Sequence, residues 1–298
     1  MELKTVTTFL FAFLLLSPLT VNYAQDSTKT DGDEWEWDWE SSEFNEWVNL
    51  GKKMPTISGY YGITDIKDEE ISQSLTDGNL LQLELGHTRR NTSSYADYIV
   101  RYNYKNLYLG YLSSELTGSD SDTNQINSKT WRFGVGNSAG YGYEMGNSSL
   151  ILYNSWSFDW SNVDFTNLAN NPEDQNTLDY IEDGIRFGTS FDGGVRFVAT
   201  SLITLDAGFQ RSIVFPRHLF WKWAGSALIE ATSQGLLDIF IKEIFRSSPA
   251  AGPIVYFVLK NALSYGIYEL RQAKMNWPFP SAPPLAFDSF KFGVMFTF

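Results

Sequence analysis

The chain has 298 residues, of which 43% are hydrophobic and 16% aromatic but only 19% charged. This mixture is unusual for a soluble enzyme and suits a membrane barrel with Tyr and Trp at both interfaces. The net charge of −13 argues against nucleic acid as a partner, because such binding depends on Lys and Arg that neutralise phosphates. The absence of Cys excludes disulfides, thiolate metal sites and a lipid anchor through Cys.

The first residues have the pattern of an export signal. Lys4 precedes an apolar run from Phe9 to Leu16, and a small residue of the kind found at cleavage sites follows at Ala24. The run is about eight residues long, whereas a helix needs ~20 residues to cross a bilayer. Residues 1–24 are therefore predicted to be a signal peptide that is removed on export, with an uncleaved interfacial helix as the alternative.

Residues 25–54 form a predicted acidic leader that is rich in Trp. Nine acidic residues and one Lys lie between Asp26 and Trp47. Carboxylates alternate with the indoles of Trp35, Trp37 and Trp39, so an extended backbone would place the two kinds of side chain on opposite sides. Charge repulsion favours disorder for this segment. A strand offered to a partner sheet and an indole platform for a sugar are the alternatives.

From residue 79 onwards, apolar and polar side chains alternate with the period of two that is typical of strands. Leu81, Leu83 and Leu85 share one parity, and Gln82 and Glu84 take the other. The same parity test joins some segments across internal glycines into single long strands. Eight strands are predicted, at residues 79–89, 94–104, 107–114, 130–145, 149–160, 183–199, 202–214 and 288–298.

The connections between these strands differ in length. Short turns are predicted at 105–106, 146–148 and 200–201, and long polar loops at 115–129 and 161–182. Outer-membrane barrels have short periplasmic turns, longer external loops and an even number of strands. One more alternating segment, from Thr56 to Ile66, would make nine strands; either it lies outside the wall or a tenth strand is missing. The predicted fold is an all-β, antiparallel up-and-down barrel of 8 to 10 strands within residues 55–298.

The last predicted strand ends on an aromatic residue. Its apolar face is formed by Phe290, Phe292, Val294, Phe296 and Phe298. This strand resembles the closing strand of bacterial outer-membrane β-barrels, in which a terminal Phe serves as an assembly signal. Together with the export signal, it resembles the barrels of Bacteroidota-like diderm bacteria. The resemblance implies localisation in the outer membrane, with membrane lipid as a partner.

Between the last two strands, residues 216–286 have helical periodicity. Pro216 is a helix start signal, Ser233 is a candidate cap for a second helix and Pro249 ends that helix. A third helix is predicted from Pro253 to Arg271. The barrel thus contains a helical insert before its final strand.

The position of this insert relative to the barrel is restricted by the size of the barrel. An eight-stranded barrel has room only for side chains in its interior, so helices cannot form a plug. Lys260 and Glu269 within the third helix argue against a membrane-spanning helix. We expect the helices to cap a rim, to lie along an interface or to bind another protein. Strand parity places the insert outside the cell, and a miscount by one strand would move it to the periplasm.

Several polar side chains are predicted to face the lumen from their strand parity. They are Gln82, Glu84, Asp97, Arg101, Arg132, Arg186, Asp192, Arg196 and Asp206. In a narrow barrel, mixed charges form a salt-bridged and hydrogen-bonded filling rather than a conduit. The pattern therefore favours a barrel that does not conduct.

Candidate binding residues lie at the start of the helical insert. They are His218, Trp221, Lys222 and Trp223. A barrel lipase would combine a His with a Ser and an acid, and Ser226 with Glu230 is formally possible because their spacing of four places them on one helix face. Nothing in the sequence connects His218 to that pair, and triads are recognised only by geometry. No catalytic residue, cofactor or metal is predicted.

These observations favour a structural or binding role rather than an enzyme. In this hypothesis the helical insert and the acidic leader engage another envelope component, which could be a protein. A channel or small-solute porin is the second hypothesis. A barrel enzyme that acts on membrane lipid is the third.

Overall fold

The structure is a computed structural model that describes residues 52–114, 125–166, 169–182 and 184–298. The predicted signal peptide, residues 1–24, and all but the last residues of the predicted leader, 25–54, lie outside this part of the chain. The barrel and the helical insert belong to one compact unit.

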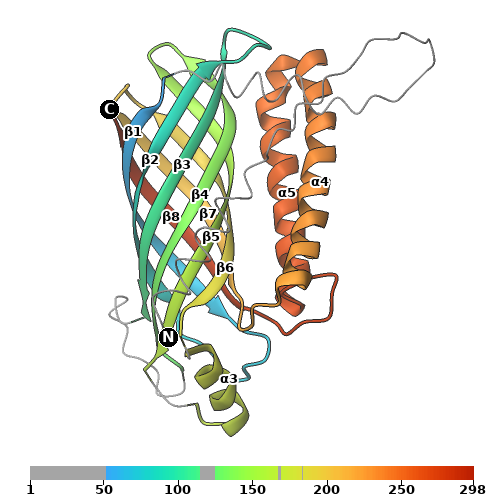
Figure 1. The fold of residues 1–298 in the computed structure, drawn as a ribbon. Helices are drawn as coiled ribbons and strands as arrows, with labels where there is room; N and C mark the ends of the chain where they lie inside the picture. Colours follow the sequence, from blue (N-terminus) through green and yellow to red (C-terminus); the bar gives the residue numbers. More distant parts are fainter. Residues whose placement is uncertain (1–51, 115–124, 167–168, 183) are drawn as a thin grey trace, which may run out of the picture. The chain divides into compact units, whose positions relative to one another are not determined.

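Eight antiparallel strands close into a barrel in which each strand pairs with its neighbours in sequence and β8 pairs with β1 (Figure 1). The predicted fold, an antiparallel barrel with a helical insert before the last strand, is confirmed. The strands are β1 (Met54–Lys67), β2 (Gly78–Thr92), β3 (Ile99–Ser113), β4 (Ser128–Met145), β5 (Ser148–Phe165), β6 (Arg186–Val198), β7 (Ile203–Val214) and β8 (Leu285–Thr297).

The predicted ninth strand at Thr56–Ile66 is part of the wall. It forms β1 and pairs with β2 on one side and with β8 on the other, which closes the barrel. Its placement outside the wall, one of the two alternatives, is wrong. The number of strands is still eight, because the two strands predicted at 94–104 and 107–114 are a single strand.

The turn predicted at 105–106 is wrong, and the strands predicted at 94–104 and 107–114 are one strand, β3. Lys105 lies opposite His87 and Asn137 in an uninterrupted ladder. The turn between β2 and β3 lies at residues 93–98 instead. Because a continuous strand keeps one parity, Tyr102 and Tyr104 are buried in the lumen rather than facing outward.

The two rims of the barrel differ in their connections. We call the rim where β1 begins and β8 ends the inner rim and the opposite one the outer rim. The connections at the inner rim are short, at 93–98, 146–147 and 199–202, and those at the outer rim are long, at 68–77, 114–127, 166–185 and 215–284. This asymmetry is the one found in outer-membrane barrels.

Burial alternates along each strand, as the sequence pattern requires. Leu81, Leu83 and Leu85 on the outer wall are about half exposed, whereas Gln82 and Glu84 between them are 5% exposed. A barrel wall has one apolar and one polar face, and here the apolar face is the outer one. Together the outward side chains form an apolar belt around the barrel. Exposure of such a belt to water is unfavourable, because apolar surface is stabilised by removal from water.

A short helix, α3 (Pro172–Glu182), lies within the connection at the outer rim that was predicted to be a polar loop. Its Leu178 and Ile181 are buried in an apolar cluster with Ile71 and Leu75 of the β1–β2 connection. Ile126 joins the same cluster and pairs with Leu75 in a short bridge. Residues from three connections therefore cover the outer end of the lumen with an apolar lid.

The helical insert contains two long helices, α4 (Phe220–Ser247) and α5 (Gly252–Ala273), joined by the short helix η2 (Pro249–Ala251). The first two predicted helices are one: Ser233 caps nothing, and its hydroxyl donates to the carbonyl of Ile229 at 2.9 Å. In the described part of the chain, no single helix combines the length and hydropathy of a membrane span.

The two helices form a hairpin on the outside of the barrel. Figure 1 shows α4 and α5 side by side along the wall, and α5 contacts β4, β5 and β6. The expectation that the helices would not enter the lumen is met, but they neither cap a rim nor project from one. They leave the outer rim and fold back along the wall towards the inner rim.

Candidate functional site

An ion pair enclosed by tyrosines fills the middle of the lumen. Arg196 Nε lies 2.7 Å from Asp206 Oδ2, and both side chains are at most 3% exposed. The hydroxyls of Tyr60 and Tyr153 donate to the carboxylate of Asp206 at 3.0 and 2.9 Å. The Arg196 guanidinium carbon lies 3.8 Å from the ring centroid of Tyr153. These contacts provide the partners that a buried charge needs.

Further polar contacts join lumen-facing side chains between this pair and the outer rim. Lys291 Nζ of β8 lies 2.6 Å from Asp192 Oδ2 of β6. Arg132 Nη1 of β4 donates to Ser212 Oγ of β7 at 2.8 Å. Because these contacts join strands that are not neighbours in the barrel, their side chains fill space in the lumen.

Three of the residues predicted to face the lumen lie elsewhere. Asp97 is exposed in the turn between β2 and β3. Arg101 is on the outer wall, because the turn wrongly predicted at 105–106 reversed the parity of the residues before it. Arg186 is at the outer rim, where its Nε donates to the carbonyl of Ile181 at 3.1 Å and its Nη1 to that of Pro216 at 3.1 Å. It therefore ties the end of α3 to the connection that leads into the hairpin. Glu84, Arg132, Asp192, Arg196 and Asp206 are buried inside the barrel.

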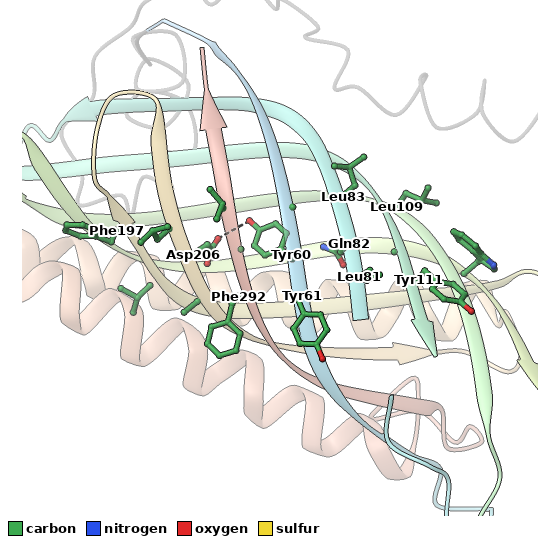
Figure 2. A pocket seen from close by; sticks show the side chains of 18 residues that line it. Tyr60, Tyr61, Leu81, Gln82, Leu83, Leu109, Tyr111, Phe197, Asp206 and Phe292 are labelled. Carbon is green, nitrogen blue, oxygen red and sulfur yellow. Dashed lines mark hydrogen bonds between the residues drawn. The ribbon is translucent and has the colours of Figure 1, made fainter. Parts of the chain in front are cut away.

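A hollow on the barrel surface does not open the lumen. Figure 2 shows Tyr60 turned towards Asp206 inside the barrel, whereas Tyr61 and Phe292 turn to the outside. The apolar side chains that line the hollow, such as Leu81 and Leu83, belong to the exposed outer wall. The hollow is thus part of the apolar belt.

The hairpin binds the wall through a polar contact at mid-height. Asn154 of β5 lies among apolar outward-facing residues, and its Nδ2 donates to Asn261 Oδ1 of α5 at 3.0 Å. Opposite Asn154 on β6 is Gly193, where a Cβ atom would lie 2.0 Å from Asn261 Oδ1. The absence of a side chain at Gly193 therefore makes room for the amide of Asn261. We call Asn154, Gly193 and Asn261 the wall seam.

Two charged residues near the outer end of the wall also face the hairpin. The Tyr268 hydroxyl of α5 donates to Asp288 Oδ1 of β8 at 2.8 Å. The guanidinium carbon of Arg211 lies 4.4 Å from the ring centroid of Tyr265. The hairpin therefore covers polar side chains that would otherwise interrupt the apolar outer wall.

Two ion pairs hold the helices of the hairpin together. Lys260 Nζ of α5 lies 2.6 Å from Asp238 Oδ1 of α4, and Arg271 Nη1 lies 2.9 Å from Glu230 Oε2. Arg271 also donates to Ser226 Oγ at 3.0 Å. The lysine that argued against a spanning helix is thus 7% exposed and paired within the hairpin.

The predicted binding residues lie together where α4 leaves the outer rim. The His218 ring packs with Phe187 and Trp223, at centroid distances of 5.3 and 6.2 Å, and burial lowers the pKa of His218. Lys222 Nζ donates to the carbonyl of Pro280 at 2.6 Å. Trp221 is 84% exposed. The group is an aromatic cluster at the rim, from which only Trp221 projects fully.

The possible triad of His218, Ser226 and Glu230 is not assembled. Ser226 and Glu230 are both bound by Arg271, which stabilises the glutamate as an ion-pair partner rather than as a partner of an imidazole. Within the described residues, no hydrogen bond joins His218 to either of them. The arrangement offers no activated nucleophile, because a serine of this kind needs an adjacent base.

The comparisons with known proteins found similarity among solved structures. No family model and no curated protein matches it. Among solved structures, Neisserial surface protein A is 10% identical with a TM-score of 0.35, covering 82% of this chain and 97% of that one. Ail of Yersinia pestis is 7% identical with a TM-score of 0.29, covering 83% and 100%, and its complex with the heparin analogue sucrose octasulfate is 9% identical with a TM-score of 0.33 and the same coverage.

The geometry itself defines the class of protein. A closed antiparallel barrel with an apolar outer belt, a polar packed interior and long connections at one rim has the architecture of an outer-membrane β-barrel.

The wall seam was not predicted from the sequence. The feature that could have indicated it is Asn154, a polar residue among the outward-facing apolar residues of β5, opposite Gly193 on β6.

Proposed function

We propose that this protein is a non-conducting outer-membrane barrel with a structural or binding role, and that its hairpin and its acidic leader engage another envelope component. The filled lumen is the observation that supports this most directly. An ion-paired interior under an apolar lid leaves the outer surface as the place where function can reside.

The hairpin is the feature of that surface that needs an explanation. A closed barrel is complete once β8 pairs with both β7 and β1, so α4 and α5 are not required for closure. The side of the hairpin away from the wall is apolar, with Leu228, Leu236 and Ile239 all more than half exposed. Trp221 continues this surface at the outer rim. Exposed apolar surface of this extent typically marks an interaction site.

Site-specific photocrosslinking tests the proposal. A photoreactive phenylalanine analogue at Trp221 or Leu236 in cells that make the protein should give a discrete protein adduct. The matched control is Leu83 on β2, an outer-wall position that is about half exposed, as Leu236 is, but lies on a bare part of the barrel. Adducts absent from all three positions, or equal at all three, would contradict the proposal. The acidic leader is tested by deleting residues 26–47 in the same experiment.

Planar-bilayer recording tests the alternative of a channel. The purified protein should show no stable openings, because Arg196–Asp206 and Lys291–Asp192 occupy the lumen. Ion-selective openings of constant size would favour the porin hypothesis.

The third hypothesis, an enzyme acting on lipid, requires that the protein turns over phospholipid or lipid A and that His218→Ala and Ser226→Ala abolish this turnover. We expect no such turnover in the unmodified protein.

A further inference from the structure

The depth that the hairpin reaches can be read from its contacts with the wall. At its base, Trp223 packs on Phe187 at the outer end of β6, with ring centroids 5.5 Å apart. At its tip, the Tyr143 hydroxyl donates to the carbonyl of Ala250 at 2.6 Å. Tyr143 lies two residues before the end of β4, next to the inner rim. The hairpin therefore extends along the wall from the outer rim almost to the inner rim.

The exposed side chains of the hairpin are uncharged over this distance. In α4 between residues 223 and 241 they are Leu228, Ile229, Ala231, Thr232, Gly235, Leu236, Ile239 and Phe240. In α5 between residues 254 and 268 they are Ile254, Val258, Ala262, Tyr265 and Gly266. The hydroxyl of Thr232 donates to the carbonyl of Leu228 at 2.8 Å, so it is satisfied within the helix. This face of the hairpin is uncharged and largely apolar, like the outer wall of the barrel beside it.

Apart from Asp238, whose side chain is 37% exposed and paired with Lys260, the exposed charges of the hairpin lie beyond the two ends of this face. Glu243 and Arg246 are exposed at the end of α4 near the tip, and Glu269 and Lys274 at the end of α5 near the base. The stretch of α4 that contributes to this face, residues 223–241, is about 19 residues long, or ~28 Å at 1.5 Å per residue. The apolar band of an outer-membrane barrel is ~25 Å tall. The uncharged face thus has the height of the hydrocarbon layer.

The charged residues within that height are paired between the two helices. Glu230, whose side chain is 16% exposed, pairs with Arg271, and Asp238, whose side chain is 37% exposed, pairs with Lys260. Intramembrane charges are tolerated when they face a bundle interior and pair with one another. The wall seam satisfies the polar amides in the same way on the side that faces the barrel.

We infer that the α4–α5 hairpin crosses the outer membrane beside the barrel, with hydrocarbon chains of lipid covering its exposed face. The pair of helices and the wall supply the polar contacts that a single helix in lipid would lack. The hairpin tip then lies on the same side of the membrane as the barrel termini. This inference depends on the barrel lying in the membrane; a partner protein at Leu236 would then meet the hairpin within the membrane, in place of part of the lipid on that face.

Cysteine labelling of the two ends of the hairpin tests this topology. The chain contains no Cys, so single variants need no altered background. Ala273→Cys at the base and Ser248→Cys at the tip both replace exposed residues. In intact cells, a membrane-impermeant maleimide should label one end only, the base, and permeabilising the outer membrane should expose the tip. Equal labelling of both ends in intact cells would overturn the inference.

A second measurement tests the lipid contact itself. The purified full chain is reconstituted in phosphatidylcholine vesicles that contain a phospholipid with a diazirine in its acyl chain, and labelled peptides are mapped after illumination. Peptides with Leu236 and Val258 should be labelled as strongly as the peptide with Leu83, and the α3 peptide should remain unlabelled. Label on Leu83 without label on the hairpin would place the barrel in lipid and the hairpin in water, which overturns the inference while leaving the proposed function untouched.

Discussion

Arg271 shows, at the scale of single residues, how a charge is accommodated beside the barrel. Its side chain is 4% exposed, and it binds Glu230 and Ser226 together. A matched pair lies on the same hairpin: Arg246 Nη1 is 2.6 Å from Glu243 Oε1, but these side chains are 67% and 62% exposed. Two ion pairs of similar length therefore differ mainly in burial, which allows the effect of burial to be measured.

The Arg271→Met variant should lower the free energy of local opening of the hairpin by about 3–5 kcal/mol, because it leaves Glu230 buried without a counter-ion. The Arg246→Met control should change it by about 0–1 kcal/mol, as expected for an exposed pair. Amide hydrogen exchange of α4 and α5 in detergent micelles measures both. Adding Glu230→Leu to Arg271→Met should recover most of the loss; a double variant as unstable as the single one would contradict the role assigned to the pair.

Asp174 of α3 stabilises the lid at the outer rim by binding the β1–β2 connection. Its carboxylate accepts hydrogen bonds from the Ser72 hydroxyl at 2.7 Å and from the amides of Ser72 and Gln73 at 3.1 Å each. The Ser72 hydroxyl and these amides lower the pKa of Asp174. Since the folded pKa lies below the ordinary value of about 3.9, this stabilisation is complete above that value and is lost as the pH falls through the folded pKa.

In carbon NMR, the Asp174 carboxyl should therefore titrate below pH ~3.9. At neutral pH, Asp174→Asn should speed hydrogen exchange at the amides of Ser72 and Gln73, because an amide group is a weaker acceptor than a carboxylate. Glu173→Gln, a change at the exposed neighbour, should not. Normal exchange in Asp174→Asn, or a carboxyl that titrates above the ordinary value, would contradict this account of the lid.

At the scale of elements, strand parity predicts most of the barrel, and its failures have a local cause. Long strands such as β4 and β6 are recognised across their glycines because one face remains apolar throughout. β3 is divided wrongly because Lys105 and Asn106 look like a turn, whereas Lys105 belongs to a polar patch of the outer wall near the inner rim. A one-residue error in parity then moves every side chain before it to the other face, Arg101 included.

The hairpin is harder to predict because its position depends on contacts between distant residues. Helical periodicity predicts the helices, but nothing local indicates that Asn261 meets Asn154, 107 residues away in sequence. The charges of α4 and α5 look incompatible with lipid until their partners on the other helix are known. The position of the insert along the wall is thus a property of the assembled fold.

Excising the hairpin should leave a folded but weaker barrel. Val214 and Leu285 lie opposite each other in the ladder, so a short Asn-Gly turn can replace residues 215–284. The truncated barrel should still show heat-dependent mobility in gels, but its free energy of unfolding in urea should fall, because Asn154 then faces lipid without Asn261. Adding Asn154→Leu should restore part of that loss. If excision abolishes folding, or if Asn154→Leu has no effect, the wall seam does not have the role described.

At the scale of the whole molecule, the barrel has two unlike flanks and an interior filled by side chains. One flank, at β1 to β3, presents a bare apolar wall, and the other carries the hairpin. Ion pairs occupy the interior, and the apolar lid covers it at the outer rim. Such a molecule can act through its sides and its outer rim, which is why a binding or structural role in the envelope is proposed.

The measurement that tests this account most directly is a nitroxide scan of β2 in lipid vesicles, one Cys variant at a time from Leu80 to Gly86. Collision with dissolved oxygen should rise and fall with a period of two, high at Leu81, Leu83 and Leu85 and low at the positions between them, because only the first set faces hydrocarbon. High collision with a water-soluble nickel reagent at Leu83, or no alternation along the strand, would contradict the account.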